Sequence, residues 1–334
     1  MRLGRALLVR RMAAALQGTG LIHPVTVAAC YARRRPVFQV LTYHRVNDDR
    51  DPFFPAVPTE VFERHMACLA RHYRVLTVEA LVERMQRDRV PRDAVAITFD
   101  DGYRDNLTHA APILCRYGLP ATVFLAAGFI GTAEVAWFDR LAWAFKTTRS
   151  GAWTAPWQET LPLGTEAERL RALDRALRYF KRLPDDRLQA LVEQALTALG
   201  VTDCKAFKDL MLTWDDVHAL AGLGFSIGAH TVNHPILSRV PARRAWTEIS
   251  GSRRMIESAL GRAPQAFAYP NGRPEDYTDA VVQMVRDAGF ACALTTRFGT
   301  NSAATSPWEL RRGGPWEADL PTFALKLALY RATA

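Results

Sequence analysis

The stretch "ITFDDGY", Ile97 to Tyr103, decides how this 334-residue chain is interpreted, because an apolar run ends there in two adjacent carboxylates and a glycine. An Asp-Gly pair is common in solvated turns, so the pattern by itself fits an ordinary turn. The second interpretation is that Asp100 and Asp101 do different jobs in one site. That interpretation requires partner residues elsewhere in the chain, at positions that the fold would bring to the same place.

Short apolar runs rich in β-forming residues alternate with segments of helical periodicity along most of the chain. The predicted strands are Val37–Tyr43, Val95–Phe99, Ala121–Leu125, Phe225–Ala229, Gln265–Tyr269 and Phe290–Leu294. One predicted helix begins at Thr59, and others span Asn106–Tyr117, Trp214–Leu223, Ala245–Leu260 and Asp276–Ala288. This alternation predicts an α/β fold with a parallel sheet and right-handed crossovers, and a barrel would carry its active residues at the carboxyl ends of the strands.

Residues 131–210 interrupt this alternation, because they contain helical patterns over Glu166–Arg182 and Asp185–Leu199 without intervening strands. We therefore predict a (β/α) barrel over 37–330 that a helical insertion, 131–210, interrupts. Residues 1–36 are interpreted as a basic N-terminal leader.

The leader carries much of the net charge of +9, since seven arginines precede Val37 and the first acidic residue is Asp48. It is a candidate for peripheral contact with an anionic membrane, and the alternative is a lightly packed terminal helix. Its apolar core is shorter than that of a secretory signal. The five cysteines are scattered without metal-ligand or redox spacing and are expected to be reduced. These features favour the cytoplasm or the inner membrane face and leave secretion open. The arginines accompany no nucleic-acid motif, so we expect no nucleic-acid partner.

Polar residues follow the predicted strands at their carboxyl ends. His44 follows the first strand, Asp100 and Asp101 follow the second, and "HTVNH", His230 to His234, follows Ala229. Histidines four apart on a helical turn share one face, so His230 and His234 can bind one ion. One carboxylate would complete a set of ligands that leaves positions open for water and substrate, and the other would remain free as a base.

"TFDDGY", "HTVNHP" and "AYPNG", together with "LTYHRV" near the start, make the sequence resemble the NodB-type polysaccharide deacetylases, a carbohydrate esterase family (family four). The resemblance covers about 38–130 and 211–312, and "LTYHRV" places the chain nearest the branch with an N-terminal Tyr-His motif. It implies a distorted (β/α) barrel and the hydrolysis of N-acetyl groups on N-acetylhexosamine sugars in a cell-surface or exopolysaccharide pathway.

Carried over by position, the resemblance implies that Asp100 is the catalytic base and that Asp101, His230 and His234 bind a divalent ion, most often zinc. A metal-bound water would attack the acetyl carbonyl while Asp100 takes its proton. The third motif, Tyr269, Pro270 and Asn271, matches the oxyanion and substrate segment, with the Asn271 amide as the donor.

The sequence departs from the commoner family pattern in two places. It has no histidine after His234 to act as the acid, and Phe267 and Ala268 stand where an arginine is expected before Pro270. We assign the acid to His44, with a structural histidine as the alternative. We assign the residue that steadies Asp100 to Arg312, with Arg311 as the alternative.

Three functions are compatible with the sequence. The leading one is a metal-dependent hydrolase that removes N-acetyl groups from a glycan or a glycan precursor. The second is an amidase that acts on a non-sugar N-acylated amine. The third is a carbohydrate-binding relative that keeps the fold and has lost turnover, which the two departures would explain.

Overall fold

The computed structural model describes residues 36–201, 207–314 and 317–333, together with four single positions before them. The leader, 1–36, therefore lies almost wholly outside the described residues, and so does the membrane contact predicted for it. In the described part of the chain, no helix is both long enough and apolar enough to cross a membrane.

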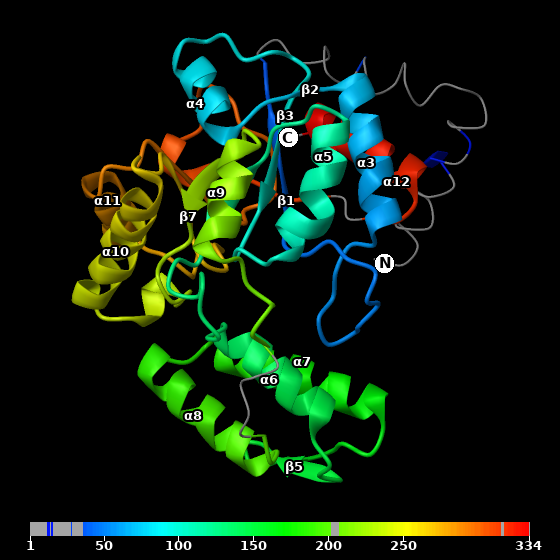
Figure 1. Ribbon diagram of the computed structural model, residues 1–334, viewed down its shortest axis with the longest axis vertical. Coiled ribbons are helices and arrows are strands. Elements are labelled where there is room, and N and C mark those ends of the chain that lie inside the picture. Colours follow the sequence, from blue (N-terminus) through cyan, green and yellow to red (C-terminus); the bar gives the residue numbers. More distant parts are fainter. Residues whose placement is uncertain are drawn as a thin grey trace.

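A parallel sheet of seven strands forms the centre of the molecule (Figure 1). Its order is β1–β3–β4–β7–β8–β9, and β2 also pairs with β3. The strands are β1 (Gln39–Tyr43), β2 (Arg74–Val75), β3 (Ala94–Phe99), β4 (Thr122–Leu125), β7 (Ser226–Ala229), β8 (Ala266–Ala268) and β9 (Cys292–Leu294). All six predicted strands are present. The two-residue β2 was not predicted, because so short a strand carries no periodicity.

The sheet curls into a distorted barrel, and the chain after β9 crosses the opening between β9 and β1. Leu310 forms a parallel bridge with Leu294, and Asn301 forms an antiparallel bridge with Phe38. The Gly313 N–H donates to the Val40 carbonyl at 3.0 Å. Arg312 thereby enters the barrel next to the first strand.

Helices cover the outside of the sheet, as expected for parallel strands joined by crossovers. They are α3 (Thr59–His72), α4 (Val78–Gln86), α5 (Ala111–Arg116), α9 (Trp214–Gly222), α10 (Ala242–Leu260), α11 (Asp279–Asp287) and α12 (Leu320–Thr333). The helix predicted over 106–117 is present in two parts, a π-helical turn (Asn106–Ala110) and α5. The sequence prediction missed α4 and α12.

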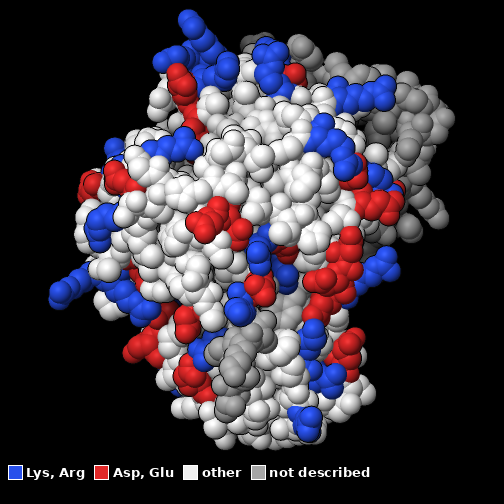
Figure 2. Space-filling model, viewed as in Figure 1, with Lys and Arg blue, Asp and Glu red and all other residues white. Residues whose placement is uncertain are grey.

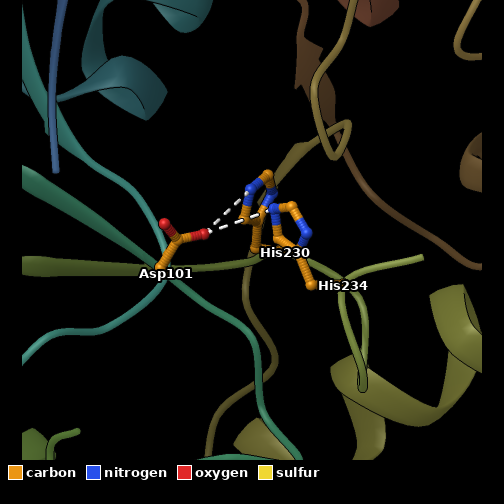
Figure 3. Close-up of side chains that lie close together, drawn as sticks. All are labelled: Asp101, His230 and His234. Carbon is orange, nitrogen blue, oxygen red and sulfur yellow. Dashed lines mark ion pairs between the residues drawn. The ribbon is translucent and has the colours of Figure 1, made fainter. Parts of the chain in front are cut away.

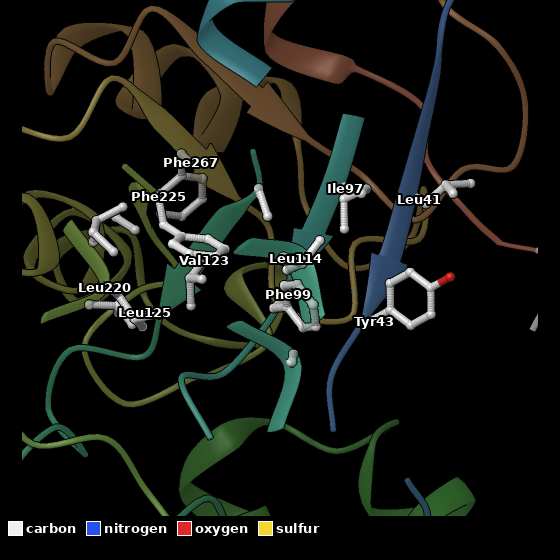
Figure 4. Close-up of a cluster of buried hydrophobic side chains, with 14 of the residues drawn as sticks. Leu41, Tyr43, Ile97, Phe99, Leu114, Val123, Leu125, Leu220, Phe225 and Phe267 are labelled. Carbon is white, nitrogen blue, oxygen red and sulfur yellow. The ribbon is translucent and has the colours of Figure 1, made fainter. Parts of the chain in front are cut away.

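Alternate residues of each strand pack into two different apolar cores, one between the sheet and the helices and one inside the barrel, because successive side chains point to opposite faces. Leu41 and Ile97 face the surrounding helices (Figure 4), whereas Val40 and Ala96 belong to a cluster inside the barrel. Leu81 of α4 packs into that inner cluster. The inside of the barrel is therefore packed with side chains, and the polar residues gather at the strand ends.

A helical lobe follows the loop after β4. It consists of α6 (Trp137–Thr147), β5 (Ala152–Thr154), β6 (Thr160–Pro162), α7 (Glu166–Phe180) and α8 (Asp185–Ala198). The two helices predicted here are α7 and α8, and the prediction missed α6 and the hairpin. The lobe has its own apolar cluster and lies beyond the carboxyl ends of the barrel strands (Figure 1).

Candidate metal centre and active site

The strand ends bring together residues from four separate segments. His44 follows β1, Asp100 and Asp101 follow β3, His230 and His234 follow β7, and Asn271 follows β8. All six line one cavity of about 880 Å³ between the barrel and the helical lobe. The predicted convergence at the carboxyl edge is thus present in the structure.

The turn after β3 points Asp100 and Asp101 into this cavity. The Asp100 N–H still donates to the Tyr43 carbonyl at 3.0 Å, so the sheet ends at that residue. Asp101 has a φ of 74° and Gly102 a φ of 85°, both in the left-handed region. Glycine adopts the φ of Gly102 without strain, and a Cβ there would also crowd the Ile130 side chain at 2.9 Å. The unusual backbone lets consecutive carboxylates share one site instead of facing opposite ways.

Asp101, His230 and His234 form a buried cluster whose ligand atoms all lie within 4.8 Å of one another (Figure 3). Oδ1 of Asp101 lies 3.6 Å from Nε2 of His230 and 3.3 Å from Nε2 of His234. Asp101 Oδ1 and His234 Nδ1 are buried without a hydrogen-bond partner among the described residues. Buried polar atoms left in this state are costly, and a cation would satisfy the carboxylate oxygen. The donor set therefore fits a divalent ion.

His230 and His234 meet through a loop, so the predicted helical turn was wrong. Residues 230–234 are irregular, and His234 has a φ of 54°. Glu248 of α10 holds this loop from behind, because its carboxylate accepts the N–H of Val232 at 3.0 Å and that of Asn233 at 2.7 Å. A buried carboxylate thus takes the place of the hydrogen bonds of a helix.

The histidines of the cluster are suited to ligation in their neutral form. Burial lowers the pKa of His230 to about 4, although Asp100 opposes this shift. Burial and the neighbouring His230 lower the pKa of His234 well below its ordinary value. Nδ1 of His230 lies 2.7 Å from the Ala268 carbonyl and donates to it, which leaves Nε2 to face Asp101.

Asp100 is held by Arg312 through two parallel hydrogen bonds. Nη1 donates to Oδ1 at 2.7 Å and Nη2 donates to Oδ2 at 2.6 Å, with both side chains buried. Burial alone would raise the pKa of Asp100, but Arg312, His230 and His44 together hold it well below its usual range. Arg311, the alternative, is exposed, and its backbone N–H donates to Asn301.

Asp101 has the opposite electrostatic environment. Burial, followed by the charges of Asp100 and Asp139, raises its pKa well above the ordinary value. The two adjacent carboxylates are therefore inequivalent: Arg312 favours the ionised form of Asp100, and a bound cation would favour the ionised form of Asp101.

His44 lies on the solvent side of Asp100. Its Nε2 is 3.9 Å from Asp100 Oδ2, and 53% of its side chain is exposed. Asn106, in the π-helical turn, donates to the His44 carbonyl at 2.8 Å and fixes the backbone there. The ring therefore reaches the cavity, whereas Tyr43 before it is buried and bonds to His65.

The third motif contributes less than predicted. Asn271 lines the cavity with a φ of 56°, and among the described residues no acceptor takes its backbone N–H. Tyr269 instead stacks on Tyr277 in the core and donates to the Trp308 carbonyl at 3.0 Å. Tyr269 and Pro270 are buried and do not line the cavity, so their assignment as substrate-contacting residues is corrected. A tyrosine that continues β8 alternates to the helix-facing side.

Sequence reasoning missed several residues of the site. Lys181 and Asp139 line the cavity from the helical lobe, and Glu248 supports the histidine loop. None of the three belongs to a motif or follows a strand. Only the packing of the lobe on the barrel reveals them.

Comparisons with known proteins agree with this fold and with the predicted family. A model of the family described as "Polysaccharide deacetylase" matches residues 87–293, more than half of the chain. A putative polysaccharide deacetylase of Bacillus subtilis, YxkH, is 22% identical over 275 residues, which are 82% of this chain and 69% of that protein.

Two solved structures share the fold. The Streptococcus pyogenes deacetylase PplD, in complex with acetate, superposes with a TM-score of 0.58 at 20% identity, over 90% of this chain and all of that one. IcaB from Ammonifex degensii gives 0.57 at 18% identity, over 89% and 98%.

A curled parallel (β/α) barrel with a buried Asp-His-His cluster at its carboxyl edge fits a hydrolase whose active site lies at the strand ends. Within that class, the chain belongs to the polysaccharide deacetylase family. Enzymes of this family hydrolyse C–N bonds other than peptide bonds, so the predicted family and type of enzyme are confirmed.

Proposed function

We propose that this protein is a metal-dependent deacetylase that removes N-acetyl groups from N-acetylhexosamine units of a glycan or glycan precursor. The observation that carries the proposal is the inequivalent carboxylate pair, with Asp100 ionised by Arg312 and Asp101 joined to two neutral histidines. The deacetylase PplD, which shares the fold, was solved with acetate bound. Acetate is the product expected here, so that complex supports the same reaction class.

Asp101, His230 and His234 would hold the ion, and an oxygen and two imidazole nitrogens suit zinc. When bound, the ion supplies Lewis acidity to the acetyl carbonyl and lowers the pKa of water.

Asp100 acts as the proton acceptor. Arg312 fixes both of its oxygens, so the carboxylate stays ionised and cannot rotate away. Oδ2 lies 3.9 Å from the rings of both His44 and His230, so this oxygen faces the space where water and substrate meet. The water proton passes to this oxygen as the C–O bond forms.

His44 and Asn271 act on the other atoms of the amide. Asn271 lines the cavity, and its N–H, which no acceptor takes among the described residues, would donate to the developing oxyanion. His44 gives a proton to the nitrogen as the C–N bond breaks, which releases acetate and the free amine.

Acetate release tests the proposal. The purified protein is stripped with a chelator, reloaded with zinc, and assayed with N-acetylglucosamine oligomers and with N-acetylated polyamines; Asp100→Asn serves as the control. Zinc-dependent acetate from the sugars alone supports the proposal, and turnover of the polyamines alone would favour the amidase. Retained glycan binding without turnover, whichever divalent ion is supplied, would favour the binding protein.

A further inference from the structure

The cavity that contains the metal centre is walled mainly by apolar side chains. The polar residues of the active site occupy one part of it. The rest of the wall comes from the loop after β1 and from α6 and α7 of the helical lobe, and includes Phe53, Phe54, Val57, Phe138, Leu173 and Leu177. A polysaccharide is polar along its whole length, so a wall of this extent exceeds what one stacked sugar ring would use.

The loop and the lobe form this wall as one unit. Phe53 is buried in the apolar cluster of the lobe, and Lys146 of α6 pairs with Asp51 of the loop at 2.5 Å. Phe138 also touches the metal centre, with its ring centroid 5.3 Å from that of His234. The apolar wall is therefore continuous with the catalytic residues.

Lys181 adds a cation to this wall, and Figure 2 shows basic and acidic side chains side by side where the lobe meets the barrel. Lys181 follows α7 directly and lines the cavity. Among the described residues, no carboxylate lies within the 4 Å of an ion pair with it. Burial and the neighbouring Arg273 lower the pKa of Lys181, although Asp276 and Asp101 oppose this shift. The other two cations of the cavity each have a carboxylate within ion-pair distance: Arg45 lies 3.0 Å from Asp105, and Arg273 lies 4.0 Å from Glu275.

A half-buried ammonium group without a carboxylate partner is costly unless a ligand supplies an anion. Lys181 lines the same cavity as Asp100 and the three residues of the metal centre. An anionic group of the substrate at Lys181 would thus adjoin the sugar whose acetamide reaches Asp100.

We propose that the substrate is amphiphilic: an N-acetylated sugar joined through a phosphate to a hydrocarbon chain. The acetamide lies at Asp100, the phosphate meets Lys181, and the hydrocarbon lies along the wall formed by the loop and the lobe. This inference rests on the proposed deacetylase function and specifies the substrate of the same site.

The test compares four substrates with the zinc-loaded enzyme. They are N-acetylglucosamine 1-phosphate esterified to a farnesyl chain, the same sugar phosphate without the chain, uncharged octyl N-acetylglucosaminide, and an N-acetylglucosamine pentamer. We expect the farnesyl phosphodiester to have the highest kcat/KM, by about tenfold or more over each of the others, since each missing contact removes about 1.5 kcal/mol or more.

Two variants test the contributions of the Lys181 charge and of the apolar wall to substrate binding separately. Lys181→Gln should lower kcat/KM for both phosphates about tenfold more than for the octyl glycoside, because only an anion is held by the ammonium. Leu177→Gln should raise KM for the two substrates with chains and spare the other two. Arg178→Gln, an exposed neighbour on α7, is the matched control.

Equal rates on all four substrates, or a preference for the pentamer, would overturn the amphiphilic substrate and leave the deacetylase intact. A phosphate effect without a chain effect would refute the hydrocarbon assignment. No acetate from any of the four would count against the deacetylase itself.

Discussion

Arg312 and Asp100 are 212 positions apart in the chain, yet they form a buried bidentate pair with donor–acceptor distances of 2.7 and 2.6 Å. A third bond, from Arg312 Nε to the Thr295 carbonyl at 3.0 Å, fixes the guanidinium plane. The pair orients the proposed base and keeps it ionised beside a second carboxylate.

Replacing Arg312 tests this relationship. Arg312→Ala should destabilise the fold by about 3–5 kcal/mol, since it leaves a buried carboxylate without its partner. Arg312→Lys keeps the charge and loses the bidentate geometry, so it should fold and show a reduced kcat. Thermal unfolding and acetate release measure the two effects. The adjacent and exposed Arg311→Ala is the control, and a Lys variant with unchanged kcat would refute the positioning role.

Replacing Asp100 and replacing Asp101 should have different effects on turnover and on zinc content. Asp100→Asn should keep stoichiometric zinc and lose roughly 10²–10⁴-fold in kcat, as expected when a general base is removed. Asp101→Asn should lose zinc, because it removes the oxygen ligand. Metal analysis after gel filtration, with acetate release in parallel, checks both outcomes. Zinc loss in the Asp100 variant instead would reverse the two assignments.

Removing the proposed acid should lower turnover without affecting the metal. We expect His44→Ala to reduce kcat by roughly 10²-fold or more, with KM and zinc content close to wild type. The side chain is half exposed, so the fold should tolerate the change. Unchanged turnover would remove His44 from the reaction and leave the deacetylase assignment standing.

Glu248 should control the metal site from outside it. Glu248→Gln removes the negative charge to which the two loop N–H groups donate and leaves a neutral carbonyl oxygen as their acceptor, so His234 should be held less firmly. We expect zinc affinity to fall by roughly 10–100-fold, as for other residues that orient ligands. Competition with a chromogenic chelator measures this, with the exposed Glu257→Gln of α10 as control. Equal affinities in the two variants would contradict the positioning role.

His65 should make the protein sensitive to acid. It is buried between the Tyr43 hydroxyl and the Glu317 carbonyl, and burial lowers its pKa to about 4. Because the unfolded histidine titrates near 6.5, only the unfolded chain gains this proton between about pH 6.5 and 4, and stability falls as the pH falls through that window.

Titration of His65 should lower the free energy of unfolding by about 2 kcal/mol between pH 7 and pH 5. Urea unfolding at both pH values, in the presence of chelator, should therefore show a smaller acid loss in His65→Gln than in wild type. The exposed His218→Gln should behave as wild type does. A variant that loses stability in acid as wild type does would show that His65 is not the group responsible.

Much of the barrel was predictable because β strands and amphipathic helices leave local patterns. Val95–Phe99 and Phe225–Ala229 are apolar runs of strand length, and both form strands within one residue of the predicted bounds. The helix α12 was missed because its apolar residues lie all round it, so no polar face marks a helical period. The segment from His230 to His234 was predicted as a helical turn because the histidines are four residues apart. That spacing does not reveal that Glu248, which is distant in the sequence, holds the segment as a loop.

The sequence by itself determined the family, the strand alternation and the Asp-His-His set, because these residues lie in short motifs at strand ends. Tertiary structure decided which arginine pairs with Asp100, since the barrel closure places Arg312 inside and leaves Arg311 exposed. It also placed Lys181 and the apolar wall beside the metal centre. The physical reason is that long-range packing and burial, which no local pattern encodes, determine which charges face one another and how their pKa values shift.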